Sequence, residues 1–413
     1  MLKRTGAAFA ISLVLVAAVA ALASWRWLAA RAPRSGSSPE AELLSQLHSL
    51  GYLDSAGLEP GGEKLRGVTL EIPGRSQPGV NLYLVSGRGE VRLIDASGRA
   101  LHVWNLGASR PGWHHAELAP DGTLLVIRRD GELLALDARS RVLWSRPLGA
   151  HHDLALLPSG EIAVLRSVFI DVPYQGRRLP LVDDRVAVLS PGGELLREFS
   201  LHRLFGSSIP AERLAQIASR PPEHWLERVH PPRRGVDVFH TNSVEVLSAD
   251  LPGLGRRGDF LLSIRELDLL AVVDPTGEQV RWSWGEGELE SQHAASLTPG
   301  GNVLVFDNGI RRGFSRVLEI DPVARRIVWE HRGDPPASFY SRRMGASQAL
   351  ANGNRLVTSS EQGTVFEITP EGKRVWEFWT PDVDAKRRRR ATLYRMTRYP
   401  AEVTAALVSR ADP

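Results

Sequence analysis

The chain has 413 residues, of which 43% are hydrophobic, so it can bury a substantial core in one large repeat domain or in several smaller domains. Its formal net charge is only +4, and no basic motif is interleaved with aromatic residues, so a nucleic-acid-binding protein is not expected. The chain contains no cysteine, which excludes disulfide bonds and a thiol nucleophile.

The N-terminus has the pattern of an export signal. Lys3 and Arg4 precede an apolar run over 6–23, and two tryptophans follow it. The segment 21–23 offers a cleavage site, but the length of the run and the interfacial tryptophans favour a retained membrane anchor. We therefore predict a signal peptide or signal-anchor helix over 1–31, with the rest of the chain outside the cytoplasm.

Residues 32–65 are predicted to form a linker that contains a short helix. The first part of this segment is rich in Ser, Pro and Gly, which is typical of linkers. Leu43, Leu44, Leu47 and Leu50 then recur at helical spacing. This spacing predicts a short amphipathic helix that serves for packing.

The remainder of the chain repeats one pattern, in which a strand, a turn and a second strand with an aromatic residue follow one another. The turns hold the Asp, Pro and Gly residues that tight hairpins require. Six copies end at Trp104, Trp144, Phe199, Trp282, Trp329 and Trp376. Regular copies lie 40 or 47 residues apart, which is typical of propeller blades. We predict an all-β fold, a six-bladed β-propeller over 66–400, closed by pairing of its N- and C-terminal strands and followed by a tail over 401–413.

Three segments depart from this pattern. The segments 166–183 and 202–235 lengthen two intervals, and we interpret them as insertions, which are often functional. The second insertion precedes His240, which makes it a candidate lid over the channel mouth. The basic run 386–390 is predicted to be a solvated loop, with attraction for an anionic substrate or membrane surface as the alternative.

A histidine recurs at one position of the repeat. His114, His152 and His293 each lie eight residues before a turn glycine, and His240 begins an interrupted copy. A further copy has Gly345 in place of the histidine. The first strand of each blade lines the central channel of a propeller, and the histidine precedes this strand. We therefore expect the imidazoles to meet at one mouth of the channel.

Each histidine taken alone is well explained as a buried structural residue. Four at one repeat position favour a function, because packing alone would also accept Asn, Ser or Thr. Two of them belong to doublets, His114–His115 and His151–His152, and the register of the repeat favours His114 and His152 as the inward-pointing members.

Two chemistries use convergent imidazoles. One is metal binding, although the sequence has no carboxylate or second histidine at helical ligand spacing. The other is nucleophilic and acid–base chemistry on an anion, with neutral histidine as the nucleophile and a cation as the stabiliser of charge. Arg265, at the end of an apolar strand, is the candidate cation. The alternative for Arg265 is a surface ion pair with Glu266 or Asp268.

Two motifs suggest a family. One is Asp237-Val-Phe-His-Thr-Asn-Ser243, and the other is Gln292-His293 followed by Val305-Phe-Asp-Asn-Gly309. With the segments 93–104, 262–265 and 350–354, they resemble the bacterial arylsulfotransferase (aryl-sulfate sulfotransferase) family. The chain is shorter than the long members of that family and lacks their cysteines.

The resemblance implies a periplasmic six-bladed propeller, and the N-terminal pattern adds attachment to the inner membrane through the N-terminal helix. It implies transfer of a sulfuryl group from an aryl sulfate donor to a phenolic acceptor by a ping-pong mechanism through a sulfohistidine. It implies neither a cofactor nor a metal, and the nucleotide donor PAPS is not needed.

The resemblance also assigns residues. His293 matches the nucleophile, His240 a histidine that handles charge or protons at the phenolic oxygen, and Arg265 the sulfate-binding arginine. His152 matches a further channel histidine. The residues expected to contribute to substrate binding are Asn242, His151, His114 and Asn308. The alternatives are a non-catalytic envelope propeller that binds a protein or glycan, and a metal- or quinone-dependent propeller enzyme.

Overall fold

The computed structural model describes residues 55–58, 61–85, 89–107, 112–219, 235–404 and 407. The predicted helices within 1–31 and 40–50 lie outside these residues. Among the described residues, no helix combines the length and apolar character needed to cross a membrane.

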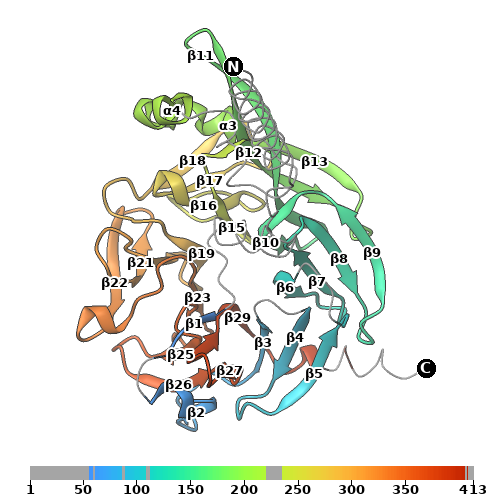
Figure 1. The fold of residues 1–413 in the computed structure, drawn as a ribbon, viewed down its shortest axis with the longest axis vertical. Coiled ribbons are helices and arrows are strands. Elements are labelled where there is room, and N and C mark those ends of the chain that lie inside the picture. Colours follow the sequence, from blue (N-terminus) through green and yellow to red (C-terminus); the bar gives the residue numbers. More distant parts are fainter. Residues whose placement is uncertain are drawn as a thin grey trace, which may run out of the picture. The chain divides into compact units, whose positions relative to one another are not determined.

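Four sheets of the described chain are built from strands that follow one another in sequence (Figure 1). Their strands are β6 (Trp113–Leu118), β7 (Leu124–Arg128), β8 (Glu132–Leu136) and β9 (Val142–Pro147); β10 (Ala150–Leu156), β11 (Ile162–Tyr174), β12 (Arg177–Leu189) and β13 (Leu195–Ser200); β15 (Thr241–Val246), β16 (Phe260–Ile264), β17 (Leu269–Val273) and β18 (Val280–Trp284); and β19 (His293–Leu297), β20 (Val303–Asp307), β21 (Arg316–Asp321) and β22 (Arg326–Arg332). These strands pair in antiparallel fashion, and the short β14 (Val236–Asp237) joins β12 in parallel.

Two further sheets unite the N- and C-terminal parts of the described chain. In the first, β29 (Leu393–Tyr399) pairs with β3 (Val80–Val85), followed by β4 (Glu90–Ile94) and β5 (Ala100–Asn105). In the second, β2 (Gly67–Glu71) pairs with β26 (Arg374–Trp379), followed by β25 (Thr364–Ile368), β24 (Arg355–Ser359) and β23 (Ala346–Ala349). The expected pairing of N- and C-terminal strands therefore occurs twice, once at an inner and once at an outer strand.

The inner strands of these six sheets form a closed series of contacts. Strand β6 contacts β10, and the contacts continue through β15, β19, β23 and β29 back to β6. Figure 1 shows the sheets arranged around a common centre. The predicted β architecture is thus confirmed as a mostly β, propeller-like arrangement of sheets.

The aromatic residues of the repeat connect each sheet to the next. Each tryptophan lies on an outer strand, and its indole Nε1 donates to a backbone carbonyl in a turn of the following sheet at 2.7–3.2 Å. The pairs are Trp104 with Asp137, Trp144 with Pro191, Trp282 with Pro322, Trp329 with Pro370, and Trp376 with Ala96. Phe199 has no such donor and packs instead on Gly277, where an added Cβ would lie 2.2 Å from its ring. The predicted role of these aromatics in packing between units is confirmed.

The two insertions form one feature beside the sheet of β10–β13. The segment 166–183 extends the β11–β12 hairpin. The described part of 202–235 contains α3 (Leu201–Phe205), the 3₁₀ turn η2 (Gly206–Ser208) and α4 (Ala211–Ala218), whose apolar side chains join the core of that sheet. Residues 220–234 of the proposed lid lie outside the described residues.

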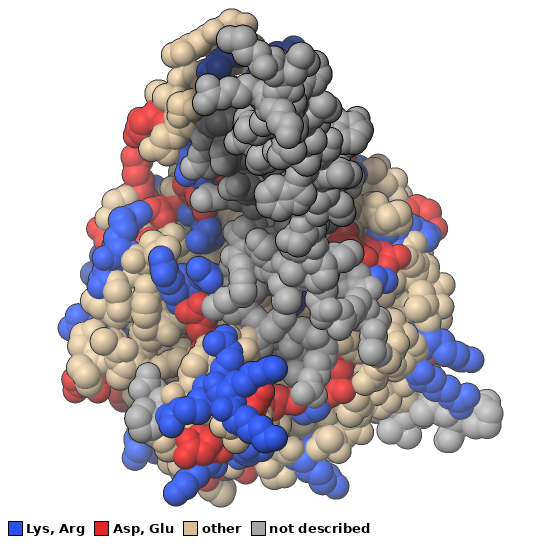
Figure 2. All heavy atoms as spheres, in the orientation of Figure 1, with Lys and Arg blue, Asp and Glu red and all other residues tan. Residues whose placement is uncertain are grey.

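The basic run 386–390 belongs to a small sheet of β1 (Ser55–Gly57), β28 (Arg389–Ala391) and β27 (Val383–Asp384). Residues 386–389 are exposed, as expected for a solvated loop, and Figure 2 shows Lys and Arg side chains gathered near this hairpin. Arg390 is buried and donates to the backbone carbonyls of Thr380 and Gly62. Among the described residues, the other 3₁₀ turns are η1 (Gly62–Lys64), η4 (Arg265–Leu267) and η5 (Pro336–Ser338).

Candidate functional site

The recurring histidines meet where the inner strands begin. The ring of His152 lies 5.2 Å from that of His114, 5.1 Å from that of His151 and 4.6 Å from that of His240, measured between centroids. His293 is close enough that its charge would act on His152. The convergence predicted from the repeat is therefore present as one group, the histidine cluster (His114, His151, His152, His240 and His293).

Irregular backbone positions these side chains. The register shifts between the first two strands of each sheet next to His152, His240 and His293. His152 and His240 have φ of 56° and 46°, and Ala294, directly after His293, has φ of 50°. Residues other than glycine rarely adopt this left-handed region, and such positions concentrate at functional sites. A register shift together with a left-handed residue therefore accompanies the histidine in three sheets.

One copy of the repeat lacks the histidine for a steric reason. Gly345 has φ of 155°, and a Cβ at this position would lie 2.4 Å from the ring of Phe306. Phe306 is fully buried in the neighbouring strand β20. A side chain at position 345 would therefore displace part of the core.

Hydrogen bonds define the tautomer of His293. The amide Nδ2 of Asn308 donates to the carbonyls of Ser341 at 2.7 Å and Met344 at 3.0 Å, so its Oδ1 faces His293. His293 Nδ1 lies 2.8 Å from this oxygen and 3.1 Å from the carbonyl of Ser291. Because both neighbours are acceptors, Nδ1 carries the hydrogen and Nε2 carries the lone pair. Asn308 thus holds His293 rather than occupying the channel itself.

The electrostatic surroundings keep His293 neutral. Burial is the main cause that lowers its pKa to about 3, and the nearby charge of Arg265 acts in the same direction. The hydrogen bond to Asn308 opposes these effects only in part. At neutral pH the imidazole is therefore an uncharged base with an available lone pair on Nε2.

The contacts of Arg265 agree in part with both roles predicted for it, a cation beside the imidazoles and an ion pair with a neighbouring carboxylate. Its guanidinium pairs with Glu266, while Asp268 binds Arg311 instead, at 2.9 Å. Its Nε has no hydrogen-bond partner among the described residues. The effect of its charge on the pKa of His293 places it within electrostatic reach of that residue. Arg265 can therefore supply positive charge beside His293.

His240 forms a pair with a carboxylate that sequence reasoning missed as a site residue. Its Nδ1 lies 2.6 Å from Asp237 Oδ2, and its backbone N–H donates to Asp237 Oδ1 at 2.7 Å. Burial alone would raise the pKa of Asp237, but the His240 charge and hydrogen bonds lower it to about 2. The carboxylate orients the ring and stabilises its protonated form. The only sequence signal was the spacing of three residues between Asp237 and His240.

His152 and His151 are in contact with each other, but their surroundings differ. Burial, followed by the charge of His240, lowers the pKa of His152 well below its usual value. The Nδ1 atoms of His151 and His152 lie 2.9 Å apart, and His151 Nε2 lies 3.2 Å from Asp184 Oδ1. Asp184 also accepts from the backbone N–H of Thr241 at 2.7 Å. His151 thus connects His152 to the start of β15.

Two buried amides fix the backbone beside His293. Asn242 Nδ2 donates to the carbonyl of Gln292 at 2.8 Å. Gln292 Nε2 lies within 3.1–3.3 Å of Ser263 Oγ and the carbonyls of Ile264 and Leu269. These contacts flank both His293 and Arg265, so Asn242 and Gln292 position them. Gln292 belongs to one of the sequence motifs but was not predicted as a site residue.

His114 lies at the edge of the cluster. Its ring is 4.1 Å from Tyr394 of β29 and 5.2 Å from His152. The second member of its doublet, His115, points instead to Asp153, with Nε2 3.3 Å from Oδ1. Tyr394 is a neighbour that the repeat did not indicate. Among the described residues, no group of three or more His, Asp or Glu side chains is arranged to hold a metal ion.

Solved structures with similar folds are distant in sequence. A protein of unknown function from Bacteroides caccae is 14% identical with a TM-score of 0.51, over 78% of this chain and 99% of that one. A streptogramin B lyase is 12% identical with a TM-score of 0.45, over 79% and 84% of the two chains. A virginiamycin B lyase from Staphylococcus aureus is 10% identical with a TM-score of 0.43, over 85% and 86%. Only the first of these structures has a TM-score above 0.5, and at 14% identity its likeness concerns the fold alone.

Sequence comparison is more specific. No curated protein matches the chain. The sequence model of the arylsulfotransferase (ASST) family matches residues 148–381, which are more than half of the chain. The match runs from just before β10 to just after β26 and includes His152, His240, Arg265 and His293. The chain therefore belongs to the arylsulfotransferase family, and this membership suggests sulfotransferase activity on aryl sulfates.

Proposed function

We propose that the chain transfers a sulfuryl group from a phenolic sulfate ester to a phenol, by a ping-pong mechanism through a sulfohistidine at His293. No nucleotide donor takes part. The observation that carries this proposal is the fixed neutral tautomer of His293, with its hydrogen on Nδ1 and its lone pair on Nε2. Family membership supports the same reaction class.

In the first half-reaction, the Nε2 lone pair of His293 forms a bond to sulfur as the bond between sulfur and the aryl oxygen breaks. Sulfuryl transfer resembles phosphoryl transfer, in which charge is spread over the equatorial oxygens. Arg265 stabilises these oxygens, and preorganised charge of this kind is a large contribution to catalysis. The leaving phenolate takes a proton from His240.

In the second half-reaction, the steps run in reverse on a new phenol. Neutral His240 accepts the phenolic proton as the phenol oxygen attacks sulfur, and the bond between nitrogen and sulfur breaks. His293 then regains its lone pair. The pair with Asp237 at 2.6 Å suits His240 to both steps, because the carboxylate stabilises the imidazolium that forms.

The other predicted residues support these steps. His152 is neutral and lies 4.6 Å from His240, which suits it to contact the substrate as a hydrogen-bonding partner. Asn242 and Asn308 act through His293 and its backbone. His114 and His151 complete the polar wall around His152.

We further infer that the six sheets are the blades of a six-bladed β-propeller over 66–400, preceded by a signal or anchor over 1–31 and a linker over 32–65. The closed series of inner-strand contacts supports this inference. The export pattern supports a location on the periplasmic side of the bacterial inner membrane. Cell fractionation with and without residues 1–31 tests the location, because a cytosolic full chain contradicts it.

The reaction is tested with p-nitrophenyl sulfate as the donor and phenol as the acceptor. Wild-type protein should release nitrophenol, and His293→Ala should not. His102→Ala, in the outer strand β5, is the matched control and should retain activity. Intact mass after brief exposure to the donor alone should show one added sulfuryl group, mapped to His293. Absence of both turnover and the mass gain would instead support the non-catalytic envelope propeller.

A further inference from the structure

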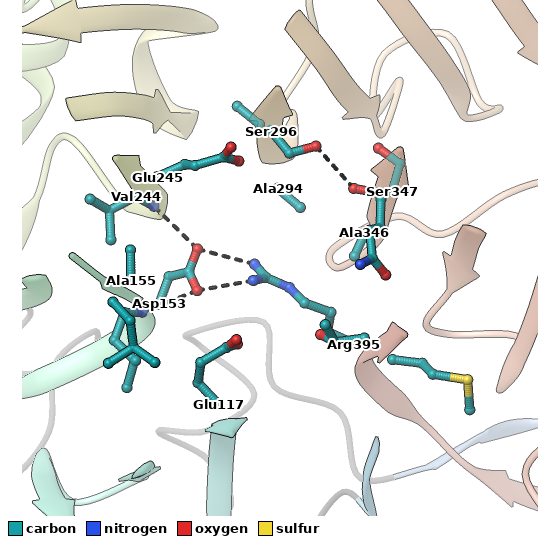
Figure 3. Close-up of a pocket in the computed structure, with 16 residues that line it drawn as sticks. Glu117, Asp153, Ala155, Val244, Glu245, Ala294, Ser296, Ala346, Ser347 and Arg395 are labelled. Carbon is teal, nitrogen blue, oxygen red and sulfur yellow. Dashed lines mark hydrogen bonds and ion pairs between the residues drawn. The ribbon is translucent and has the colours of Figure 1, made fainter. Parts of the chain in front are cut away.

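A cavity of about 280 Å³ lies between the inner strands of the sheets (Figure 3). Its wall takes residues from the inner strands of all six sheets, β6, β10, β15, β19, β23 and β29. Asp153 and Ala294, which line it, directly follow His152 and His293 in the chain. The reaction proposed above uses no group in this wall. We call the cavity the acidic chamber and define it by Glu117, Asp153, Glu245, Ser347 and Arg395.

The charges in the chamber do not balance. Arg395 makes a two-pronged contact with Asp153, with Nη1–Oδ1 at 3.0 Å and Nη2–Oδ2 at 3.2 Å. Figure 3 shows this pair between Glu117 and Glu245, whose carboxylates point into the same space. Among the described residues, no Lys or Arg forms an ion pair with either glutamate. Two carboxylates therefore lack a cation of their own.

The partial burial of these glutamates in the cavity wall is unfavourable for their ionised forms. Burial raises the pKa of Glu245 to about 8, although the backbone N–H of Leu297 donates to it. Burial likewise raises the pKa of Glu117 to about 7, although the Tyr399 hydroxyl donates to it at 2.6 Å. Each glutamate is partly buried and has a hydrogen-bond donor but no Lys or Arg ion-pair partner, so a bound cation would stabilise its ionised form.

The opposite wall contains an independent sign of a ligand. Ser347 is only 6% exposed and lines the cavity, yet its Oγ has no hydrogen-bond partner among the described residues. Such buried unsatisfied groups are uncommon and require an explanation. Ala155, Ala294 and Ala295 line the same cavity with small side chains.

The separation of the carboxylates indicates the kind of ligand. Glu117 and Glu245 come from β6 and β15, which are separated by β10 in the ring of sheets. The described residues offer no cluster of three ligands for a metal ion. An extended organic cation can reach separated carboxylates, whereas a single metal ion needs them at one point. The chamber volume is near the lower end of small-molecule sites.

We propose that the acidic chamber binds a small organic diammonium ion, with one ammonium group at each of Glu117 and Glu245 and the Ser347 hydroxyl as a further hydrogen-bond partner. This site is separate from the sulfuryl-transfer site, and its occupancy can be measured without turnover. A failure of the proposed reaction therefore leaves this proposal intact, and the reverse also holds.

Isothermal titration calorimetry on the full chain in mild detergent tests the proposal with 1,4-diaminobutane as the probe. We expect saturable binding of one diamine per chain and no binding of 1,4-butanediol, which has the same length without charge. Binding at pH 7 should release protons from the glutamates, so the measured heat should change between buffers of different ionisation enthalpy.

Matched variants localise the binding. Glu117→Gln and Glu245→Gln should each weaken diamine binding by at least about tenfold, because each removes one charge while preserving shape. Ala155→Leu should weaken it by filling the chamber. Glu278→Gln, in the exposed turn between β17 and β18, should bind as wild type does.

Three results would overturn the proposal. They are diamine binding no stronger than that of the diol, unchanged binding in both glutamine variants and in Ala155→Leu, or displacement of the diamine by millimolar MgCl₂ but not by matched NaCl. If a variant fails to show a cooperative melting transition, the comparison of diamine with diol on the wild-type chain decides the question.

Discussion

His293 Nδ1 and Asn308 Oδ1 lie 2.8 Å apart, and the amide nitrogen of Asn308 is engaged by two backbone carbonyls. Asn308 therefore cannot turn its donor toward His293 without losing both bonds. This relationship places the lone pair on Nε2, the atom that attacks sulfur in the proposed reaction.

Replacing Asn308 with alanine should lower kcat for nitrophenol release by roughly 10²–10⁴-fold, by analogy with the loss of a tautomer-fixing partner in serine proteases. Only the carbonyl of Ser291 would then remain to orient His293. Steady-state kinetics measures the effect. Asn302→Ala, in the turn between β19 and β20, is the control and should keep full activity. Wild-type kcat in Asn308→Ala would contradict the tautomer argument.

Replacing Asp237 with asparagine should reduce transfer according to the basicity of the leaving phenol. The substitution removes the negative charge that stabilises protonated His240. A series of aryl sulfates measures the dependence. The loss should be small for p-nitrophenyl sulfate, whose phenolate needs little protonation, and should reach about 10²-fold or more for basic phenols. An equal loss across the series would argue against proton donation by His240.

Replacing Arg265 with glutamine should reduce kcat/KM for aryl sulfates by about 10²–10³-fold, the usual effect of losing one preorganised charge. Arg311→Gln, which removes an exposed arginine bound to Asp268, is the matched control and should change the rate little. Kinetics with both variants compares them directly. Similar losses in the two variants would mean that Arg265 serves only as a surface ion pair.

The Glu245→Gln variant should be more stable than wild type at pH 8 and similar to it below pH 4.5. The pKa of Glu245 is about 8 in the folded protein and near 4.5 when unfolded. Between these pH values the folded state binds more protons than the unfolded state. The free energy of unfolding of the wild type therefore falls as pH rises from about 4.5 to about 8. Glutamine cannot ionise, so the variant avoids the loss. Melting temperatures from pH 4 to 9 measure the difference in stability between the variant and the wild type. A difference that does not grow with pH would mean that the pKa of Glu245 is not raised in the folded protein.

Replacing Trp376 with phenylalanine should destabilise the fold by about 1–3 kcal/mol, because it leaves the partly buried Ala96 carbonyl without its donor. This bond joins the sheet of β26 to the sheet of β4 and thereby completes the ring. Trp144→Phe removes the same kind of bond at a half-buried residue and should cost less. Chemical denaturation measures both. A greater loss of stability for Trp144→Phe than for Trp376→Phe would mean that the bond that closes the ring of sheets has no special importance for stability.

The sequence alone predicted much of the architecture, because its signals are local. Turn residues such as Asp95 and Asp137 accept bonds from backbone N–H groups two and four residues later, so each hairpin is encoded within a few residues. The position of the histidine within the repeat likewise determines that it begins an inner strand. These regularities were sufficient to predict repeated β units and a convergence of imidazoles.

Only the tertiary structure shows the contacts within the candidate site. Asn308 was expected to bind substrate but holds His293, and Asp237 was overlooked although it binds His240. The acidic chamber joins Glu117, Glu245 and Arg395 from three sheets. Such contacts depend on strand register, on bulges and on closure of the ring, which bring together residues separated by more than a hundred positions. No local pattern records these distances, so only the folded chain determines which side chains meet.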